Sequence, residues 1–395
     1  MTISAPTTAH PTTPDTVLAA IAALGPQADA RAAEIAEARR LPDDLAAMLV
    51  DTGVFRLWAP TECGGMQAAP LDLFRAIELA GYHEGSLGWI VMVCGTTSRT
   101  AGQLRSDHAR ALFGDLRSVV GGFVGPTGTA TVVPGGLRVT GRWPWGSGTP
   151  MCTAIAGTAR IVDSVGQATT LADGTSAPFI YFDRSQVELA DNWDTVGLRG
   201  SASGDFIVTD AFVPDGRWLP TLAAPATIDD PLYRFAPIGA LAGGIAAVCL
   251  GLARRAVDEI YAMGAGKRPQ GSSRSMAERP AVQADVARAE ARVHAARGFL
   301  WQATDEAYAD AANGYSSPTA RRQLRLAASH AAAESATAID ACYVAAGGSS
   351  IWRGHPLQRV FQDMHVATQH AGVAAPTFEV LGRIGFGLDT DTTMI

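Results

Sequence analysis

AAGGSSIWRGHPLQRVFQDMHVATQH, residues 345–370, is the stretch that decides the fold of this chain. It begins near the double glycine Gly347–Gly348, continues through a short polar loop and ends at His370. Pro356 predicts the start of a helix, because proline is favoured in the first helical turn, where its missing N–H would have no partner. We therefore expect a loop, a helix and a turn that carries the histidine, in this order.

Two amphipathic stripes before this stretch predict long helices. In each stripe small and apolar residues recur at steps of three and four, the period of one helix face. The second helix has Ser317 as its cap, Pro318 at its first position and Gly347 just beyond its end. Such helices pack antiparallel into a bundle. The stripes are Val282, Val286, Ala289, Val293, Ala296, Leu300, Ala303 and Ala307, then Leu324, Ala328, Ala331, Ser335, Ala338, Cys342 and Ala345.

FAPIGALAGGIAAVCLGLA (235–253) contains no charged residue and is close to the length that crosses a bilayer. It also contains Pro237 and several glycines, and it continues directly into RRAVDEIYAM, which has the pattern of an amphipathic helix. We expect a buried core helix here, and no membrane association.

Residues 118–215 have the pattern of a sheet. VVPGGLRV predicts a hairpin with Gly135 and Gly136 at its turn. APFIYFD (177–183) and DFIVTDAFVP (205–214) are further strand candidates. A strand is also predicted by the alternating residues Leu137, Val139, Gly141, Trp143 and Trp145.

The chain therefore divides into helical, sheet and helical regions. We expect a disordered tail over residues 1–15 and an N-terminal helical domain over 16–117, with helix breaks near 64–65 and 95–97. A middle β-domain should cover 118–225, and a C-terminal helical bundle 233–395. Together these regions predict an α+β protein.

The composition is that of a folded enzyme. Of 395 residues, 47% are hydrophobic and 17% charged, which argues against disorder. The net charge of −7, without a basic stripe, makes nucleic acid an unexpected partner. The five scattered cysteines form no CxxC pair or Cys/His cluster, so no disulfide framework or metal site is expected. The polar N-terminus does not resemble a signal peptide, and we expect a cytoplasmic protein.

Four blocks give the chain a resemblance to the acyl-CoA dehydrogenase superfamily. They are residues 57–93, GGFVGPTGTATVVPGGLRVTGRWPWGSG (121–148), WDTVGLRGSASGDFIVTDAFVP (193–214) and the C-terminal stretch quoted first. Their order and spacing extend the resemblance over about residues 20–385. It implies an N-terminal α-helical domain, a middle β-domain and a C-terminal four-helix bundle, with flavin as the cofactor.

The catalytic turn resembles the flavin-dependent monooxygenase branch of that superfamily. Where the dehydrogenases have a glutamate base, this chain has Gln369, His370 and Ala371. The resemblance implies the oxygenase component of a two-component system, which uses FMNH2 or FADH2 and O2 through a C4a-hydroperoxyflavin. Because no GxGxxG loop predicts a nicotinamide site, a separate NAD(P)H:flavin reductase should supply the reduced flavin. The expected substrate is an electron-rich aromatic, such as a phenol, an indole or a polyketide-type ring.

The resemblance also assigns site residues. His370 should be the acid–base group, and Ser147 should lie beside the reactive edge of the flavin. The loop 123–130 should hold the flavin pyrimidine side. Arg268, with Arg274 as the alternative, should reach a flavin phosphate on a neighbouring subunit of a homotetramer, or of a dimer. The expected cofactor-binding residues are Phe123, Pro126, Gly128, Trp145, Gly146, Ser147, Ser201, Ser203, Arg268, Gly347 and Gly348.

Other hypotheses stay open at this point. Phenol-hydroxylating members of the branch often carry a further histidine in the N-terminal helices, whereas MVCGTTSRT (92–100) has none. Oxygenation of an indole, a sulfur heterocycle or an amine is therefore an alternative. A second hypothesis is an acyl-CoA dehydrogenase with tightly bound flavin, for which Glu379 lies too far past the turn to be the base. A third is a flavin-binding scaffold without turnover.

Overall fold

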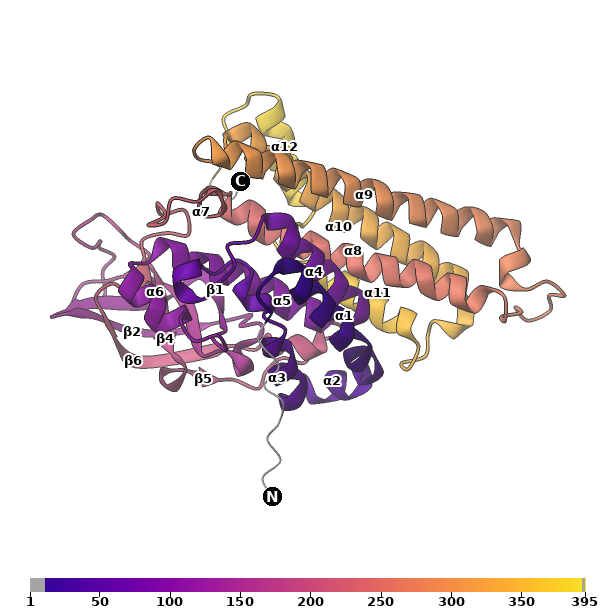
Figure 1. Cartoon of the computed structure of the whole chain (residues 1–395), viewed down its shortest axis with the longest axis horizontal. Helices are drawn as coiled ribbons and strands as arrows, with labels where there is room; N and C mark the ends of the chain where they lie inside the picture. The colour runs from indigo at the N-terminus through magenta and orange to yellow at the C-terminus, as the bar shows by residue number, and fades with distance from the viewer. Residues whose placement is uncertain (1–10, 393–394) are drawn as a thin grey trace, which may run out of the picture.

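The computed structural model of this chain describes residues 11–392 and 395. A helical region, a sheet and a helical bundle follow one another as expected, which confirms the predicted class, and Figure 1 shows the long helices extending away from the sheet. The helices are α1 (Pro14–Ala30), α2 (Ala32–Ala38), α3 (Asp43–Asp51), α4 (Pro70–His83), α5 (Gly85–Ser98), α6 (Ser106–Phe113), α7 (Pro231–Arg234), α8 (Pro237–Gly264), α9 (Pro280–Ala312), α10 (Pro318–Ala346), α11 (Pro356–Ala367) and α12 (Pro376–Gly385).

The seven-stranded sheet has the order β5-β6-β2-β1-β3-β4-β7. Only the pair β1–β3 is parallel; the other neighbours are antiparallel. The strands are β1 (Val120–Val133), β2 (Gly136–Trp143), β3 (Ala154–Ile161), β4 (Phe179–Asp183), β5 (Glu188–Leu189), β6 (Phe206–Pro214) and β7 (Trp218–Leu219). The strand predictions at 177–183 and 205–214 are confirmed by β4 and β6.

The predicted hairpin joins β1 to β2. Val133 pairs with Gly136, so the turn consists of Pro134 and Gly135, and Gly135 has φ +78°. Glycine is favoured there because the left-handed region costs it little. The sequence placed Gly136 in the turn as well, but Gly136 is the first residue of β2.

The segment FVGPTGTA (123–130) is not the separate loop that the sequence predicted. It lies inside β1, whose pairing with β3 shifts register between Phe123 and Gly128. Glycine and proline at 125 and 126 signal a turn locally, but pairing on both flanks turns the signal into a bulge. Gly128 packs under the indole of Trp143, since a Cβ atom there would lie 2.3 Å from Trp143 Cζ2.

The long helices form the bundle as predicted. α8, α9 and α10 run side by side, and α11 packs against α8 and α10. α8 is long and apolar enough to cross a membrane by length and composition, yet 78% of its most apolar window is buried inside the protein, which confirms a core helix. Both stripes are buried except at their partly exposed ends, Val282 and Ala345. Ser317 caps α10 by accepting the Ala320 N–H at 3.2 Å.

Several element ends differ from the sequence prediction. α1 begins at Pro14, inside the expected tail, and residues 1–10 of that tail lie outside the described residues. α5 continues through 95–97, where a break was expected, because flanking apolar residues pack it into the core. β2 ends at Trp143, so Trp145 lies beyond the strand. α11 ends at Ala367, which places His370 in the turn that follows.

Candidate active site

The turn that carries Ser147 is fixed against the loop before β6. The Gly146 N–H donates to the Gly204 carbonyl at 2.8 Å, and the Gly148 N–H donates to the Ser201 carbonyl at 2.9 Å. Gly148 has φ +71°, which glycine tolerates. These two backbone hydrogen bonds bring the predicted site residues of the two segments together.

Three predicted serines contact one another in this junction. Ser147 Oγ lies 2.7 Å from Ser203 Oγ, and Ser203 Oγ lies 2.7 Å from Ser201 Oγ. The Trp89 indole N–H, from α5, donates to Ser147 Oγ at 3.1 Å. All four side chains are buried. The sequence singled out the serines, but it did not reveal the contact of Trp89 with Ser147, because this contact spans 58 residues.

His370 lies across the same tryptophan. Its ring centroid is 5.9 Å from that of Trp89, in an edge-on arrangement. The Gly372 N–H donates to His370 Nδ1 at 2.9 Å, so in the neutral ring the proton resides on Nε2. A Cβ atom at Gly372 would lie 3.0 Å from His370 Nδ1 and 3.0 Å from Ile245 Cδ1, so a side chain there would crowd the imidazole.

The electrostatics of this turn keep His370 neutral. Burial, and secondly the positive charge of Arg325, lowers the pKa of the imidazole to about 4. Arg325, itself buried, donates to the Gly372 carbonyl. A neutral ring with Nδ1 occupied offers its Nε2–H as a donor. The acid–base role of His370 stays a prediction, and in this geometry the neutral ring presents a hydrogen-bond donor.

An exposed aromatic pair beside the serines offers a place for the flavin that the resemblance implies. Trp145 is 61% exposed, and its ring centroid lies 5.7 Å from that of Phe123. Its φ of +56° is strained for a bulky residue, at a cost of about 1–2 kcal/mol. An exposed indole held in strained backbone next to the polar Ser147 suits a flat, polar-edged ring. The residues present therefore fit an isoalloxazine.

Other predicted cofactor residues lie elsewhere. Ile245, near the start of α8, packs by the His370 turn, whereas Lys267, just past its end, donates to the Ala346 carbonyl. At 1.5 Å per residue the intervening helix spans roughly 30 Å. Arg268, Arg274, Gly347 and Gly348 are at this distant end, exposed, and Cβ atoms at the two glycines would meet open space. Within one chain they do not join the site at Ser147.

Several other residues that could bind a ligand instead contribute to the fold or lie away from Ser147. Pro126 is exposed in the β1 bulge. Trp143 is fully buried and donates to the Thr158 carbonyl at 2.7 Å, and Trp58 is likewise fully buried. In α5, Thr96 and Thr97 donate to carbonyls of their own helix. The described residues contain no group of three His, Cys, Asp or Glu side chains placed to hold a metal ion.

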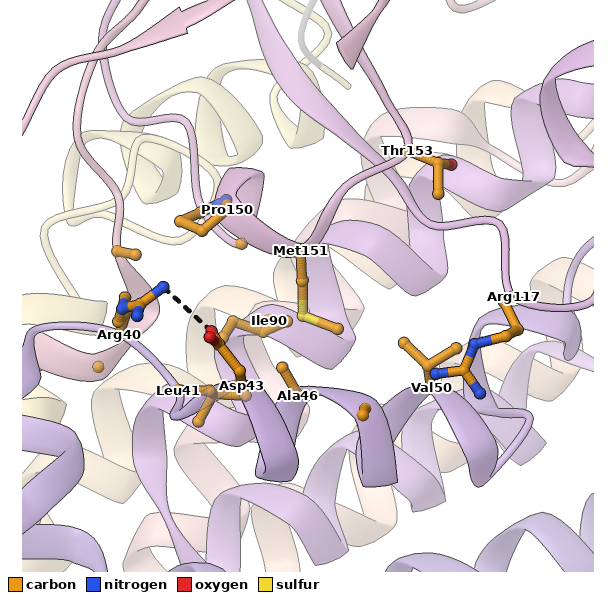
Figure 2. A pocket seen from close by; sticks show the side chains of 14 residues that line it. Arg40, Leu41, Asp43, Ala46, Val50, Ile90, Arg117, Pro150, Met151 and Thr153 are labelled. Atoms are coloured by element: carbon orange, nitrogen blue, oxygen red, sulfur yellow. Dashed lines mark ion pairs between the residues drawn. The ribbon is translucent and has the colours of Figure 1, made fainter. Parts of the chain in front are cut away.

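A cleft of about 330 Å³ lies between α3 and the segment that follows Ser147 (Figure 2). α3 contributes an apolar wall, and Pro150 and Met151 lie opposite it. Arg40 at one rim pairs with Asp43 at 3.1 Å. None of the predicted site residues lines this cleft, although its lining residue Gly148 follows Ser147 directly. The cleft is therefore adjacent to the candidate site but separate from it.

A buried carboxyl pair anchors the serine loop. Asp363 of α11 accepts the Leu198 N–H at 2.6 Å, and Glu84 accepts the Leu87 N–H at 2.6 Å as the cap of α5. Burial, and secondly the negative charge of Glu84, raises the pKa of Asp363 to about 7. Leu198 is in the left-handed region at φ +49°, so Asp363 holds a strained backbone. Sequence reasoning missed both acids, because nothing in their local pattern signals burial.

Comparisons with known proteins agree with this geometry. A family described as "Acyl-CoA dehydrogenase, C-terminal domain" matches residues 243–375. The chain is 30% identical over 361 residues to the indole-3-acetate monooxygenase of Pseudomonas putida, covering 91% of this chain and 90% of that protein. It is 30% identical over 394 residues to the flavin-dependent monooxygenase oxygenase subunit HsaA of Mycobacterium tuberculosis, covering 96% and 97%. The crystal structure of 3-HSA hydroxylase from Rhodococcus sp. RHA1 superposes with a TM-score of 0.89 at 26% identity, over 96% of this chain and 99% of that chain.

Proposed function

Because this chain belongs to the oxygenase components of the flavin-dependent monooxygenases, which share the acyl-CoA dehydrogenase fold, we propose that it inserts one atom of O2 into an electron-rich aromatic small molecule at the site between Trp145, Ser147 and His370. The chain is an enzyme that uses reduced flavin and O2. As an oxygenase component it works with a separate flavin reductase. The observation that carries the proposed site is that Trp89 contacts both the buried Ser147 and the His370 ring, while the exposed aromatic pair Trp145 and Phe123 begins two residues before Ser147.

The residues divide the work at this site. When bound, reduced flavin supplies the electrons that activate O2. Trp145 and Phe123 would hold the flat isoalloxazine ring, and Ser147 would bind at its polar edge. His370 donates its Nε2–H to an oxygen in the space between ring and substrate. The buried indole of Trp89 keeps water from this space, which protects the oxygenating species from unproductive loss of peroxide.

The side chains of α5 and the state of His370 favour one class of substrate. Thr96 and Thr97 use their hydroxyls on backbone carbonyls, and no histidine occurs between residues 92 and 100. His370 is neutral with Nδ1 occupied, so it is a poor acceptor for a phenolic proton. A ring that is electron-rich without losing a proton, such as an indole, suits this site better than a simple phenol.

The catalytic turn contains no carboxylate that could act as the base of an acyl-CoA dehydrogenase. That reaction needs a carboxylate near the flavin, and Glu379 is exposed on α12. The Glu84 and Asp363 carboxyls are buried on the far side of the serine loop, where they accept backbone N–H groups. The monooxygenase function is therefore the one that this geometry supports.

We infer further that two copies of the chain complete each flavin site in a cytoplasmic homotetramer, with a dimer as the alternative. The support is the distance of roughly 30 Å along α8 between the His370 turn and the end of the bundle that carries Arg268 and Gly348. A second copy could bring that end to the phosphate side of the flavin. The exposed apolar residues Ile351 and Trp352, beside the double glycine, fit such a contact.

Product formation tests the function. The purified chain should not oxidise NADH alone, and it should form oxygenated indole-type product when a flavin reductase, flavin and O2 are supplied. His370→Ala should lower product formation about 10²–10³-fold, the cost of losing one positioned hydrogen-bond donor, while flavin still binds. Ala47→Leu, which narrows the separate cleft, is the matched control and should change neither quantity. Consumption of NADH by the pure chain, or full activity of His370→Ala, would contradict the proposal.

A further inference from the structure

The hydrogen-bond chain at Ser147 has two ends of fixed polarity. At one end the Trp89 indole N–H can only donate, and it donates to Ser147 Oγ. At the other end the Leu198 carbonyl can only accept, and it accepts from Ser201 Oγ at 2.7 Å. Ser203 joins the two halves. All three serines are at most 4% exposed, so bulk water cannot substitute for a missing partner.

When the Ser201 proton goes to the Leu198 carbonyl, this sets the direction of every bond between the two ends, because each hydroxyl has a single proton. Ser201 gives its proton to the Leu198 carbonyl, so it accepts from Ser203. Ser203 has then used its proton, so it accepts from Ser147. Ser147 therefore donates to Ser203 and accepts from Trp89. It keeps one lone pair, and no proton, for any ligand.

The receiving carbonyl is held firmly in place. Leu198 gives its N–H to Asp363 Oδ1 at 2.6 Å, and its carbonyl also accepts from the Trp193 indole at 3.0 Å. The hydrogen bond from the Gly148 N–H to the Ser201 carbonyl holds the Ser147 turn against the loop before β6. The polarity of the chain is thus fixed by buried groups on α11 and in the loop before β6.

We propose that Ser201 and Ser203 are positioning residues that make Ser147 a pure hydrogen-bond acceptor, so that this protein selects reduced over oxidised flavin. The proposal rests on the proposed placement of the flavin edge at Ser147. Reduced isoalloxazine has a hydrogen on N5 and can donate it to the free lone pair. Oxidised isoalloxazine has a lone pair on N5, which a pure acceptor repels. A separate reductase delivers the reduced form, so this selectivity would load the enzyme in the productive state.

Two variants should change the polarity in different ways. Ser203→Ala removes the acceptor of the Ser147 proton and releases this proton toward the ligand. Oxidised flavin should then bind about tenfold more tightly, the value of one hydrogen bond, while reduced flavin binds as before. Ser201→Ala leaves Ser203 free to donate to Ser147 instead. Ser147 then receives two donors and directs its own proton outward, so affinity for reduced flavin should fall as well.

The experiment measures Kd for both redox states by anaerobic titration of the full-length protein with FMN and FAD, together with the midpoint potential of bound flavin. The ratio of oxidised to reduced Kd should decrease from the wild type to Ser203→Ala to Ser201→Ala. A tenfold decrease lowers the two-electron potential by about 30 mV. A merely structural defect would weaken both states and leave the potential unchanged. Ser98→Ala, which removes a buried hydroxyl that donates to the Gly95 carbonyl in α5, is the matched control.

The outcomes separate this proposal from the proposed function. Ser147→Ala should weaken binding of reduced flavin about tenfold, as the lone pair is lost. If it does so but both polarity variants keep the wild-type ratio, the polarity proposal is wrong and the site stands. If Ser147→Ala binds both states like the wild type, flavin does not lie at Ser147 and the proposed site is wrong. Equal affinity of the wild type for both states would also overturn the polarity proposal.

Discussion

His370 shows how one backbone N–H can set the chemistry of an imidazole. The Gly372 amide occupies Nδ1, and burial lowers the pKa to about 4, so the ring is neutral with its proton on Nε2 throughout the physiological range. A neutral donor of this kind can stabilise developing negative charge on oxygen without first losing a proton. The same residue type in the same turn would act as a base only if Nδ1 were released.

The depressed pKa of His370 predicts a stability loss in acid. Because the folded-state pKa is below the unfolded value of 6.5, the unfolded chain binds more protons between about pH 4 and 6.5. Stability should therefore fall as pH decreases through this window, by about 3 kcal/mol in total for this group. Urea unfolding of the wild type and His370→Gln at pH 7 and 4.5 measures the difference. An identical pH dependence in both proteins would contradict the assignment.

Arg325 should control the ionisation of His370 from its own helix. Its guanidinium donates to the Gly372 carbonyl, and its charge opposes protonation of the ring. In Arg325→Gln the pKa of His370 should rise, and stability should fall by about 2 kcal/mol because a buried carbonyl loses a charged donor. Titration of ¹⁵N-labelled histidines checks both the pKa and the Nε2–H tautomer.

Arg322→Gln is the control for this experiment. Arg322 lies on the same helix and donates to the Leu381 carbonyl at 2.9 Å, away from the His370 turn. It should leave the His370 titration unchanged. A wild-type titration curve in Arg325→Gln would show that the arginine only supports the fold.

At the scale of elements, α11 and the loop before β6 are joined by a carboxyl that is costly to ionise. Asp363 Oδ1 accepts the Leu198 N–H, Oδ2 has no hydrogen-bond partner, and both Glu84 and Arg359 act on its charge. The pKa of about 7 lies above the unfolded value of 3.8, so the folded chain binds the extra proton. This contribution to stability is present below about pH 4 and is lost as pH rises through 7.

A matched pair of variants tests this junction. Asp363→Asn keeps the oxygen that accepts from Leu198 and removes the charge, so it should be about 4 kcal/mol more stable than the wild type at pH 8. The advantage should vanish below pH 4. Asp363→Ala leaves the Leu198 N–H without an acceptor and should be less stable at every pH. The measurement is the free energy of unfolding in urea at several pH values from 4 to 8. If Asp363→Asn is less stable than the wild type at pH 8, the pKa of Asp363 is not raised.

The elements also show which features a sequence can reveal. The caps and stripes of α9 and α10 were predictable, because Ser317, Pro318 and the small residues after them act within a few residues of chain. FVGPTGTA was misread as a loop, because the pairing that holds it in β1 comes from β3. Ser147 and His370 were predicted as site residues from their position in the motifs of a known family, and these roles stay predictions. The contacts that set the chemistry of His370 could not be predicted, because they join distant parts of the chain. Arg325 and Gly372, for example, are 47 residues apart.

At the scale of the molecule, the bundle separates two groups of predicted cofactor residues. The sheet lies toward the start of α8 (Figure 1), and Ser147 and Trp145 follow its strand β2, whereas Arg268 comes just after the other end of α8. If one flavin contacts both groups, they come from different copies. The purified chain should then form a tetramer, or at least a dimer, by light scattering at micromolar concentration. A monomer that binds reduced flavin tightly would exclude the shared site.

Mixed oligomers test the shared site directly. Ser147→Ala and Arg268→Ala should each impair flavin binding and product formation alone. When the two variants are co-expressed, a site that takes Ser147 from one copy and Arg268 from another regains both wild-type residues in about one quarter of cases by random pairing. Co-expression of Ser147→Ala with His370→Ala is the control, because these residues share one chain's half of the site and no intact half can form. Recovery in the first pair alone would establish sites built from two copies. Failure of both pairs, with oligomers intact, would confine each flavin to a single chain.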